Sequence, residues 1–451
     1  MFRKSASFNL IITSLLCCLL GYSASAQLLD PLPRHAYWGC GFSGPNISRA
    51  GAEVTVVIPK TFSELIDLRK GDIILKVNGV LISNSSVYQE VFYTSRYVKG
   101  GSAVTLEILR EGKLTLKKGV VPPRPLESFK GVTTEYKSVV TPYGYKVQVI
   151  ISRPEEAKGK IPGVFFVRWM SCDPIEKPVS RKHGVAQLLE DFIQRSGYAV
   201  IRVEKPGLGD SEGPPCYNSD FQQEMAAHKA AYKVFTELDY IDTNKIIVLA
   251  HSNGAAWAPM VASGKMPAAY IVSGGWIKTW YEHMLEYKRK DFEWHDLPEA
   301  EVNRKMALVA ELYSDFLIGK KLPGEVIRQK PHLKEIWDDE YDHLWDLPAS
   351  YLMQLQDLNI AEAWKKVSVP TYAFYGEYDV AMSEADHRKM TDYVKANGAT
   401  ANFEYIPKME HSLFWFETRE KAMNDFYGSG VYKPELANRL FDWLRKVLPQ
   451  D

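Results

Sequence analysis

The chain has 451 residues, a length that exceeds one compact hydrophobic core and predicts two or three domains. Its composition, 46% hydrophobic and 24% charged residues, is ordinary for a globular protein and weighs against intrinsic disorder. The 55 basic residues balance the 55 acidic ones, which weighs against a nucleic-acid binder, because such proteins usually carry a basic surface.

The first 26 residues have the pattern of an export signal. Arg3 and Lys4 form a basic start, a mostly apolar run covers residues 10–20, and Ala-Ser-Ala at 24–26 suits cleavage. The apolar run is shorter than the ~20 residues of a membrane-spanning helix, so a transmembrane anchor is the weaker interpretation. We expect an exported protein, periplasmic or secreted, with no membrane span after cleavage of the signal.

The first block after the signal runs from about Tyr37 to Val121 and consists of short alternating segments separated by glycines. A proline-rich run over residues 121–125 follows it, and such runs act as extended spacers. We therefore expect a small, mainly β domain over 37–121, a linker over 122–128 and a second domain over 129–451.

This first block resembles a PDZ domain. The resemblance rests on residues 68–79, Leu-Arg-Lys-Gly-Asp-Ile-Ile-Leu-Lys-Val-Asn-Gly, and on Gly39-Cys40-Gly41-Phe42, which is similar to the carboxylate-binding loop of that family. Residues 87–98 would form the helix beside the peptide groove, and 104–110 the closing strand. The resemblance implies binding of extended peptides or protein C-termini by strand addition. A domain that only docks on its own second domain fits the sequence equally well.

From residue 133 onward, short apolar strands alternate with helices after an initial hairpin. Alternation of this kind predicts an α/β domain with a mostly parallel, doubly wound sheet that carries helices on both faces. We expect strands at 133–140, 146–152, 163–167, 199–203, 245–250, 269–272, 371–374 and 402–405, and helices at 185–195, 221–238, 254–262, 384–396 and 435–447.

One stretch, from about residue 276 to 366, shows no strand pattern and is rich in aromatic and charged residues at helical spacing. An insertion between two strands, on the loop side of such a sheet, would lie over the site as a helical cap. Long insertions of this kind are usually functional, which favours a cap over surface decoration.

The chain contains two serine-centred turns. Residues 209–213, Gly-Asp-Ser-Glu-Gly, match G-x-S-x-G letter for letter, but two prolines follow at once and no helix can continue through them. Residues 250–254, Ala-His-Ser-Asn-Gly, depart from the pattern at the first position, yet a strand leads in and a helix leads out. This context predicts Ser252 as a nucleophile rather than a helix-capping serine, and places Ser211 in a loop.

A serine nucleophile needs a base and an acid that orients the base, and in enzymes with this turn the acid precedes the histidine along the chain. Asp379 follows the strand that begins near Thr371, and Glu377 beside it is the alternative acid. His411 follows the last strand and is the one histidine after it. We expect His251, next to the nucleophile, to point elsewhere.

Residues 129–451 thus resemble the α/β-hydrolase family, and residues 204–213 resemble a loop of its exported esterase-like members. The resemblance implies that His411 takes the Ser252 proton and that Asp379 orients the imidazole. It also implies an oxyanion hole of two backbone N–H groups, from Asn253 and, in the loop after residue 167, from Met170. Arg168-Trp169 stands where many relatives have His-Gly.

Three cysteines remain after signal cleavage: Cys40, Cys172 and Cys216. In the family's fold, the strands that precede Cys172 and Cys216 are neighbours, so both loops emerge at one edge of the sheet. The resemblance therefore implies a Cys172–Cys216 disulfide, provided that the Cα atoms come within ~7 Å of each other; two free thiols are the alternative. Cys40 is expected to behave as a small buried hydrophobe.

Three functions are compatible with these features. A hydrolase of carboxylic esters is favoured, a serine peptidase that uses the PDZ-like domain to present peptides is second, and a peptide-binding module with an inactive hydrolase half is third. The sequence has no H-E-x-x-H motif, no cysteine pair at zinc spacing and no phosphate-binding loop, so we predict no metal and no cofactor.

Overall fold

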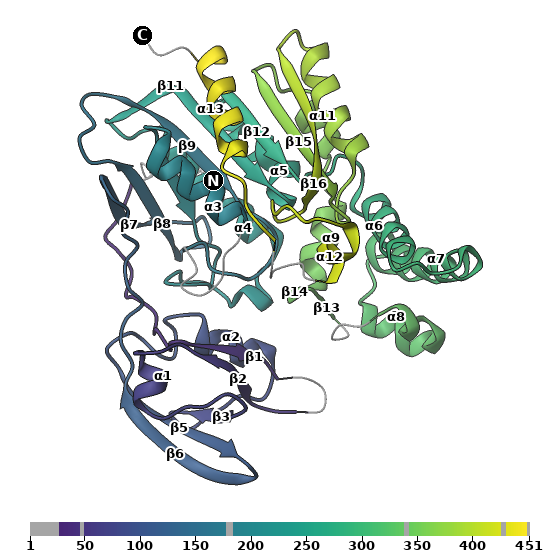
Figure 1. Cartoon of the computed structure of the whole chain (residues 1–451). Helices are drawn as coiled ribbons and strands as arrows, with labels where there is room; N and C mark the ends of the chain where they lie inside the picture. Colours follow the sequence, from purple (N-terminus) through teal and green to yellow (C-terminus); the bar gives the residue numbers. More distant parts are fainter. Residues whose placement is uncertain (1–26, 46–48, 177–183, 338–341, 425–429, 449–451) are drawn as a thin grey trace, which may run out of the picture.

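The structure is a computed structural model that describes residues 27–45, 49–176, 184–337, 342–424 and 430–448. The predicted export signal lies outside these residues. Two sheets organise the chain: a six-stranded N-terminal sheet, purple to blue in Figure 1, and an eight-stranded central sheet above it. Among the residues described, no helix is both long enough and apolar enough to cross a membrane.

The N-terminal sheet is antiparallel, and alternate residues of its strands, such as Val104, Leu106 and Ile108, are buried in a core of their own. Its strand order is β1 (Cys40–Ser43), β2 (Ala52–Val57), β3 (Ile73–Val77), β5 (Ala103–Arg110), β6 (Lys113–Val120), with β4 (Val80–Leu81) paired to β3. The helices are α1 (Phe62–Leu65) and α2 (Ser85–Phe92).

Helix α2 is shorter than the helix expected over residues 87–98. The Asn84 side chain caps its start by accepting the Val87 N–H at 3.0 Å. Beyond Phe92 the chain leaves the helix because it pairs with the second half of the molecule: the Gly209 N–H donates to the Tyr93 carbonyl at 2.8 Å. A tertiary contact therefore ends the helix.

The central sheet has the order β16-β15-β12-β11-β9-β10-β8-β7. The pairs β7–β8 and β8–β10 are antiparallel and the other pairs are parallel, so the expected mostly parallel sheet is present. The strands are β7 (Val132–Val140), β8 (Lys146–Pro154), β9 (Ile161–Val167), β10 (Ala199–Val203), β11 (Ile241–His251), β12 (Ala269–Ser273), β15 (Thr371–Tyr378) and β16 (Ala401–Glu410).

Both faces of the central sheet are covered by helices, as its continuous apolar strands require. In β9, Phe165 and Val167 face one core, whereas Val164 and Phe166 face the other. The first core contains residues of α4 (Phe221–Phe235), α5 (Asn253–Val261) and α11 (Glu384–Ala396), and the second contains residues of α3 (Gly184–Arg195) and α13 (Glu435–Val447). Helix α12 (Arg419–Asn424) lies between β16 and α13 in the chain.

The insertion between β12 and β15 is mainly helical, and its helices α6–α8 extend to one side of the central sheet in Figure 1. It comprises α6 (Trp280–Trp294), α7 (Glu299–Tyr313), α8 (Pro323–Gln329), α9 (Ala349–Gln356) and α10 (Ile360–Trp364). The expectation that it contains no strand was wrong, because β13 (His343–Leu344) pairs with β14 (Leu347–Pro348). The turn between them is made by Trp345 and Asp346, with φ values of 54° and 63°. Tight hairpins favour such positive φ values, but Asn-Gly, not Trp-Asp, is their usual sequence signal.

Candidate active site

Ser252 lies at the turn between β11 and α5, where it is 7% exposed. Its φ of 58° and ψ of −136° are strained for a residue that is not glycine, and such strain clusters at functional sites. The Ser252 N–H donates to the Ser273 carbonyl on the adjacent strand β12 at 2.8 Å, which fixes the turn against the sheet.

His411 and Asp379 lie beside Ser252 although they are far from it in sequence. The His411 Nε2 atom is 2.9 Å from the Ser252 Oγ, and its Nδ1 atom is 2.9 Å from the Asp379 Oδ2. The other carboxylate oxygen of Asp379 accepts the Met382 N–H at 2.9 Å. Asp379 follows β15 and His411 follows β16, so two neighbouring parallel strands deliver the pair to the carboxyl edge of the sheet.

The electrostatics of this pair suit a proton-accepting imidazole. Burial alone would raise the pKa of Asp379, but the charge and hydrogen bond of His411 and the charge of Lys290 hold it well below its usual range. Burial alone would lower the pKa of His411, but the charge and hydrogen bond of Asp379 outweigh burial and raise it. The carboxylate therefore stabilises the imidazolium form.

Two further residues support this arrangement, and neither was singled out from the sequence. A Cβ atom on Gly274 would lie 2.8 Å from the His411 ring, so only glycine leaves room for the imidazole there. Lys290, on α6 of the insertion, donates to the Asp379 carbonyl at 3.0 Å and to the Tyr375 hydroxyl at 3.1 Å. Its distance in sequence from either strand explains why no local pattern indicated it.

The alternative nucleophile Ser211, the alternative acid Glu377, and His251 beside the nucleophile make other contacts. The Ser211 hydroxyl accepts the Gln148 N–H at 2.9 Å, and Ser211 is not among the residues that line the cavity over Ser252. The Glu377 carboxylate accepts the Lys408 N–H at 2.8 Å. His251 was expected to point away from the nucleophile: its Nδ1 lies 2.9 Å from the Ser273 Oγ on β12, yet it also lines the cavity, with its ring centroid 5.1 Å from that of His411.

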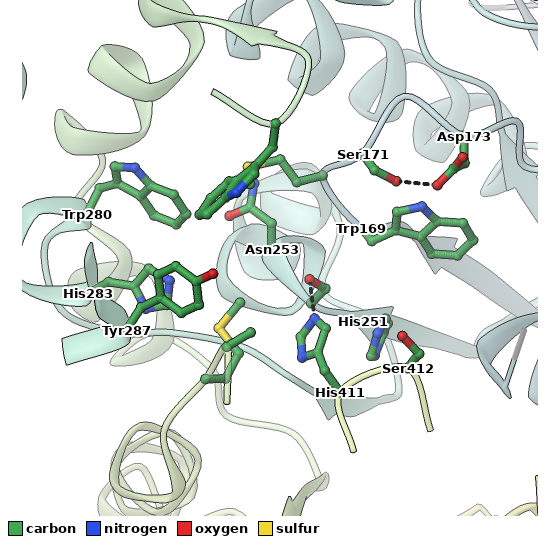
Figure 2. Close-up of a pocket in the computed structure, with 15 residues that line it drawn as sticks. Trp169, Ser171, Asp173, His251, Asn253, Trp280, His283, Tyr287, His411 and Ser412 are labelled. Atoms are coloured by element: carbon green, nitrogen blue, oxygen red, sulfur yellow. Dashed lines mark hydrogen bonds between the residues drawn. The ribbon is translucent and has the colours of Figure 1, made fainter. Parts of the chain in front are cut away.

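A cavity of about 330 Å³ opens over Ser252 and His411, and three tryptophans and a tyrosine are among the residues that line it. In Figure 2, Trp280, His283 and Tyr287 of α6 lie on one side of it and Trp169 on the other. Burial lowers the pKa of His283 to about 3, so this histidine is neutral near pH 7. The remaining lining residues are Met170, Ser171, Asp173, Asn253, Trp345, Ala381, Met382 and Ser412.

The loop after β9 lies against the start of α5 and brings Met170 to the cavity with Asn253. Arg168 does not face the cavity. It is fully buried and forms an ion pair with Glu204, while its guanidinium also donates to the Asp173 carbonyl. Arg168, which stands where many relatives have histidine, therefore holds the loop in place through these buried contacts.

Cys172 of this loop and Cys216, in a 3₁₀ turn after β10, form a disulfide with a Cα–Cα distance of 5.8 Å. Cys40 is a free thiol, and burial raises its pKa to about 12. Cys40 packs against the N-terminal core as an apolar residue would, but it is half-buried rather than buried, and its sulfur accepts the Ser63 hydroxyl at 2.9 Å.

A second cavity, of about 520 Å³, lies between the N-terminal sheet and the loop after β9. Gly39, Cys40, Gly41 and Phe42 line it from one side. Trp169 and Asp173 line it from the other, and both residues also line the cavity over Ser252. Within the ranges that the structure covers, no cluster of three or more His, Cys, Asp or Glu side chains could hold a metal ion.

The chain is similar to several solved structures at low sequence identity. No curated protein matches the chain. Solved structures with similar arrangements include Est1E from Butyrivibrio proteoclasticus with bound ferulic acid (15% identity, 70% of this chain and 100% of that chain, TM-score 0.45). An esterase of Pyrococcus furiosus (13%, 72% and 97%, 0.42) and acetyl xylan esterase 1 from Thermoanaerobacterium sp. (9%, 71% and 86%, 0.41) are also similar.

The match to a protein-family model is more informative. The model described as serine aminopeptidase, S33, covers residues 182–419, which is more than half of the chain. This range holds the elbow at Ser252, the insertion, and the strand ends that carry Asp379 and His411. The predicted α/β-hydrolase fold is thereby confirmed, and the chain belongs to the serine aminopeptidase S33 family of α/β-hydrolases.

Proposed function

We propose that the chain is a serine hydrolase that cleaves carboxylic esters through Ser252, His411 and Asp379. The observation that carries the proposal is the continuous line of contacts from the Ser252 Oγ through both His411 nitrogens to the Asp379 carboxylate, at 2.9 Å each, beneath an apolar cavity. A serine activated in this way attacks acyl carbonyl groups and forms an acyl-enzyme.

In the proposed reaction, His411 accepts the Ser252 proton as the oxygen attacks the carbonyl carbon, and then donates it to the leaving alcohol. Water, deprotonated by His411, then attacks the acyl-enzyme, and His411 returns that proton to the Ser252 oxygen as the acid leaves. The negative oxygen of each tetrahedral intermediate is bound by the backbone N–H groups of Asn253 and Met170. Loss of one such donor costs roughly 3–4 kcal/mol in other serine hydrolases.

The cavity supports an uncharged, apolar or aromatic acyl group as the substrate class. Its walls carry Trp169, Trp280, Tyr287 and Trp345, and His283 is neutral. Rings of this kind bind apolar groups through large contact areas and edge or stacked packing. Removing Trp345 (Trp345→Ala) should therefore lower kcat/KM for aromatic and medium-chain acyl esters more than for acetyl esters.

The decisive experiment measures p-nitrophenyl ester hydrolysis by the mature protein and by Ser252→Ala. We expect kcat to fall by about 10⁶-fold in the variant, as for other serine nucleophiles. Turnover by the variant as fast as that of wild type would overturn the proposal. An inactive wild type that binds peptides would favour the binding-module hypothesis instead.

A serine peptidase is the second candidate, and the shared walls of the two cavities favour it. Under this hypothesis residues 37–121 form a PDZ-like domain whose loop Gly39-Cys40-Gly41-Phe42 holds a peptide beside Trp169 and Asp173. The linker is 122–128, and the hydrolase domain is 129–451 with its cap over 276–366. Turnover of blocked dipeptide and tripeptide amides above that of esters would promote this candidate.

We also infer that the protein is exported. The disulfide supports this inference, because such bonds persist in oxidising compartments. Sequencing the N-terminus of the mature protein tests it: cleavage is expected after residue 26, and an intact Met1 would contradict it.

A further inference from the structure

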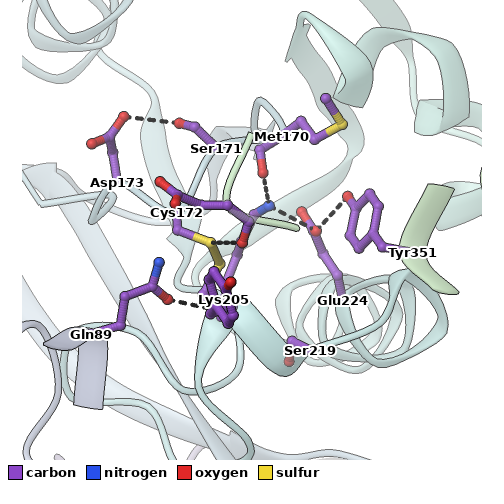
Figure 3. The surroundings of a disulfide bond; sticks show 12 residues. Gln89, Met170, Ser171, Cys172, Asp173, Lys205, Ser219, Glu224 and Tyr351 are labelled. Carbon is purple, nitrogen blue, oxygen red and sulfur yellow. Dashed lines mark hydrogen bonds and ion pairs between the residues drawn. A yellow bond between two sulfur atoms is a disulfide. The ribbon is translucent and has the colours of Figure 1, made fainter. Parts of the chain in front are cut away.

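A buried lysine lies directly behind the loop that carries Met170. Lys205 follows β10 and is 2% exposed, and its ammonium group donates to the Met170 carbonyl oxygen. The same ammonium group lies 2.9 Å from the Glu224 carboxylate of α4, which in turn accepts the Tyr351 hydroxyl at 2.7 Å. Figure 3 shows Met170, Lys205, Glu224 and Tyr351 joined in this order.

This chain of contacts is costly to bury, so it calls for a structural reason. Burial lowers the pKa of Lys205 to about 8, although the charge of Glu224 opposes that change. Burial and the adjacent Glu224 charge also raise the pKa of Tyr351 well above its usual value, so its hydroxyl stays a donor. Buried ion pairs add little net stability compared with an apolar core, and they are better explained where they orient a specific group.

The group that Lys205 orients is the peptide that follows Met170. Its carbonyl points at the ammonium group, and the proposed oxyanion donor is the N–H of the same residue, Met170. The Met170 carbonyl lies in the rigid peptide plane that follows this residue, and the Met170 N–H lies in the plane before it, joined through the φ and ψ dihedrals of Met170. On the other side of that N–H, the Arg168 carbonyl packs closely against Gly254. The Lys205 contact therefore anchors the loop on the second side of the Met170 N–H and limits how far it can shift. An oxyanion donor is effective only when it is already aimed at the developing charge.

We propose that Lys205 is a positioning residue for acyl transfer: it holds the Met170 carbonyl, and Glu224 and Tyr351 hold Lys205, so that the oxyanion loop keeps its donor aimed at the tetrahedral intermediate. The inference rests on the function proposed above. Tyr351 belongs to α9 of the insertion, and Glu224 belongs to the core helix α4. The position of the proposed oxyanion donor therefore depends on how the insertion packs against the core.

The test compares Lys205→Met and Tyr351→Phe with wild type in the full mature protein. For Lys205→Met we expect kcat/KM on p-nitrophenyl esters to fall about 10- to 100-fold with little change in KM, because the interaction acts on the transition state. The Ki of phenylboronic acid, whose serine adduct is tetrahedral, should rise by the same factor. Tyr351→Phe removes one hydroxyl, and a roughly fivefold effect in the same direction is expected.

Arg202→Met is the matched control, because it removes another buried cation of the β10 region, which pairs with Glu127 at 2.6 Å and not with the loop. It should lower thermal stability and leave both kcat/KM and the boronate Ki within about twofold of wild type. Amide hydrogen exchange over residues 168–176 should quicken in Lys205→Met and not in Arg202→Met.

Boronate affinity and loop exchange that stay at wild-type values in folded Tyr351→Phe and Lys205→Met would overturn the proposal. If Lys205→Met does not fold, Tyr351→Phe decides alone. Failure of the proposed function is separately visible, because Ser252→Ala would then retain ester hydrolysis while the exchange measurement still reports whether Lys205 holds the loop.

Discussion

Gly254 lies against Arg168 so closely that a Cβ atom at position 254 would be 2.3 Å from the Arg168 carbonyl oxygen. Gly254→Ala should therefore push the oxyanion loop away from Ser252, and we expect kcat/KM for esters to fall about 10²-fold, the cost typical of a displacement of about 1 Å. Gly264→Ala is the control, since a Cβ atom there would meet nothing within 4 Å. Equal activity of the two variants would contradict the close approach.

Asp379→Asn should lower kcat by about 10⁴-fold, because an amide cannot stabilise the imidazolium or select the productive tautomer of His411. The melting temperature should change little, so that the loss of rate does not come from unfolding. Glu377→Gln is the control for the neighbouring carboxylate, and its rate should stay within about twofold of wild type. A large loss in the Glu377 variant with a small one in the Asp379 variant would reverse the assignment.

The pH dependence of kcat/KM should show an acid limb with a midpoint above 6.5, the usual pKa of histidine. His411 must be neutral to accept the serine proton, and its pKa is raised because Asp379 outweighs burial. The rate therefore falls as pH drops through this raised pKa. Initial-rate assays of kcat/KM between pH 5 and 9, with an uncharged ester as the substrate, measure this acid limb.

Glu410 needs its own control in that experiment, because burial raises its pKa to about 7, within the same pH range. Its charge also raises the pKa of His411. Glu410→Gln should therefore keep the acid limb and move it to slightly lower pH. Disappearance of the limb in this variant would assign it to Glu410 instead of His411.

The Cys172–Cys216 disulfide closes a loop with a sequence separation of 44 residues. The double substitution Cys172→Ser with Cys216→Ser should lower the free energy of unfolding by about 2–4 kcal/mol, chiefly because the unfolded chain gains freedom. Urea denaturation with and without reductant measures this. Cys40→Ser is the control: its stability should still respond to reductant, whereas that of the double variant should not.

Lys290→Met should loosen the loop that carries Asp379, since the lysine donates to the Asp379 carbonyl and the Tyr375 hydroxyl from α6. We expect kcat/KM to fall by roughly 10-fold, less than for Asp379→Asn, because the acid itself remains. Arg289→Met, at an exposed neighbouring position of α6, should have no comparable effect. Equal losses in the two variants would point to cap stability rather than to the Asp379 loop.

Much of the fold was predictable because local patterns report local structure. Strand β10 and helices α11 and α13 have the predicted bounds, since apolar periodicity and strand length are visible in a short window. The end of α2 at Phe92 and the β13–β14 hairpin were not predicted. The end of α2 depends on a contact with Gly209, which is distant in sequence. The hairpin depends on positive φ values at Trp345 and Asp346, residue types from which such a turn is rarely predicted.

The sequence by itself determined the alternation of strands and helices and the turn context that favours Ser252 over Ser211. It also indicated the order in which the acid and the histidine follow. Only the tertiary structure decided that Lys290 and Gly274 lie against Asp379 and His411, that Lys205 contacts the Met170 carbonyl, and that His251 lines the cavity. The physical reason is that periodicity and turn chemistry act between neighbours in the chain. Buried charges and close backbone approaches instead depend on which distant segments the sheet brings to one edge.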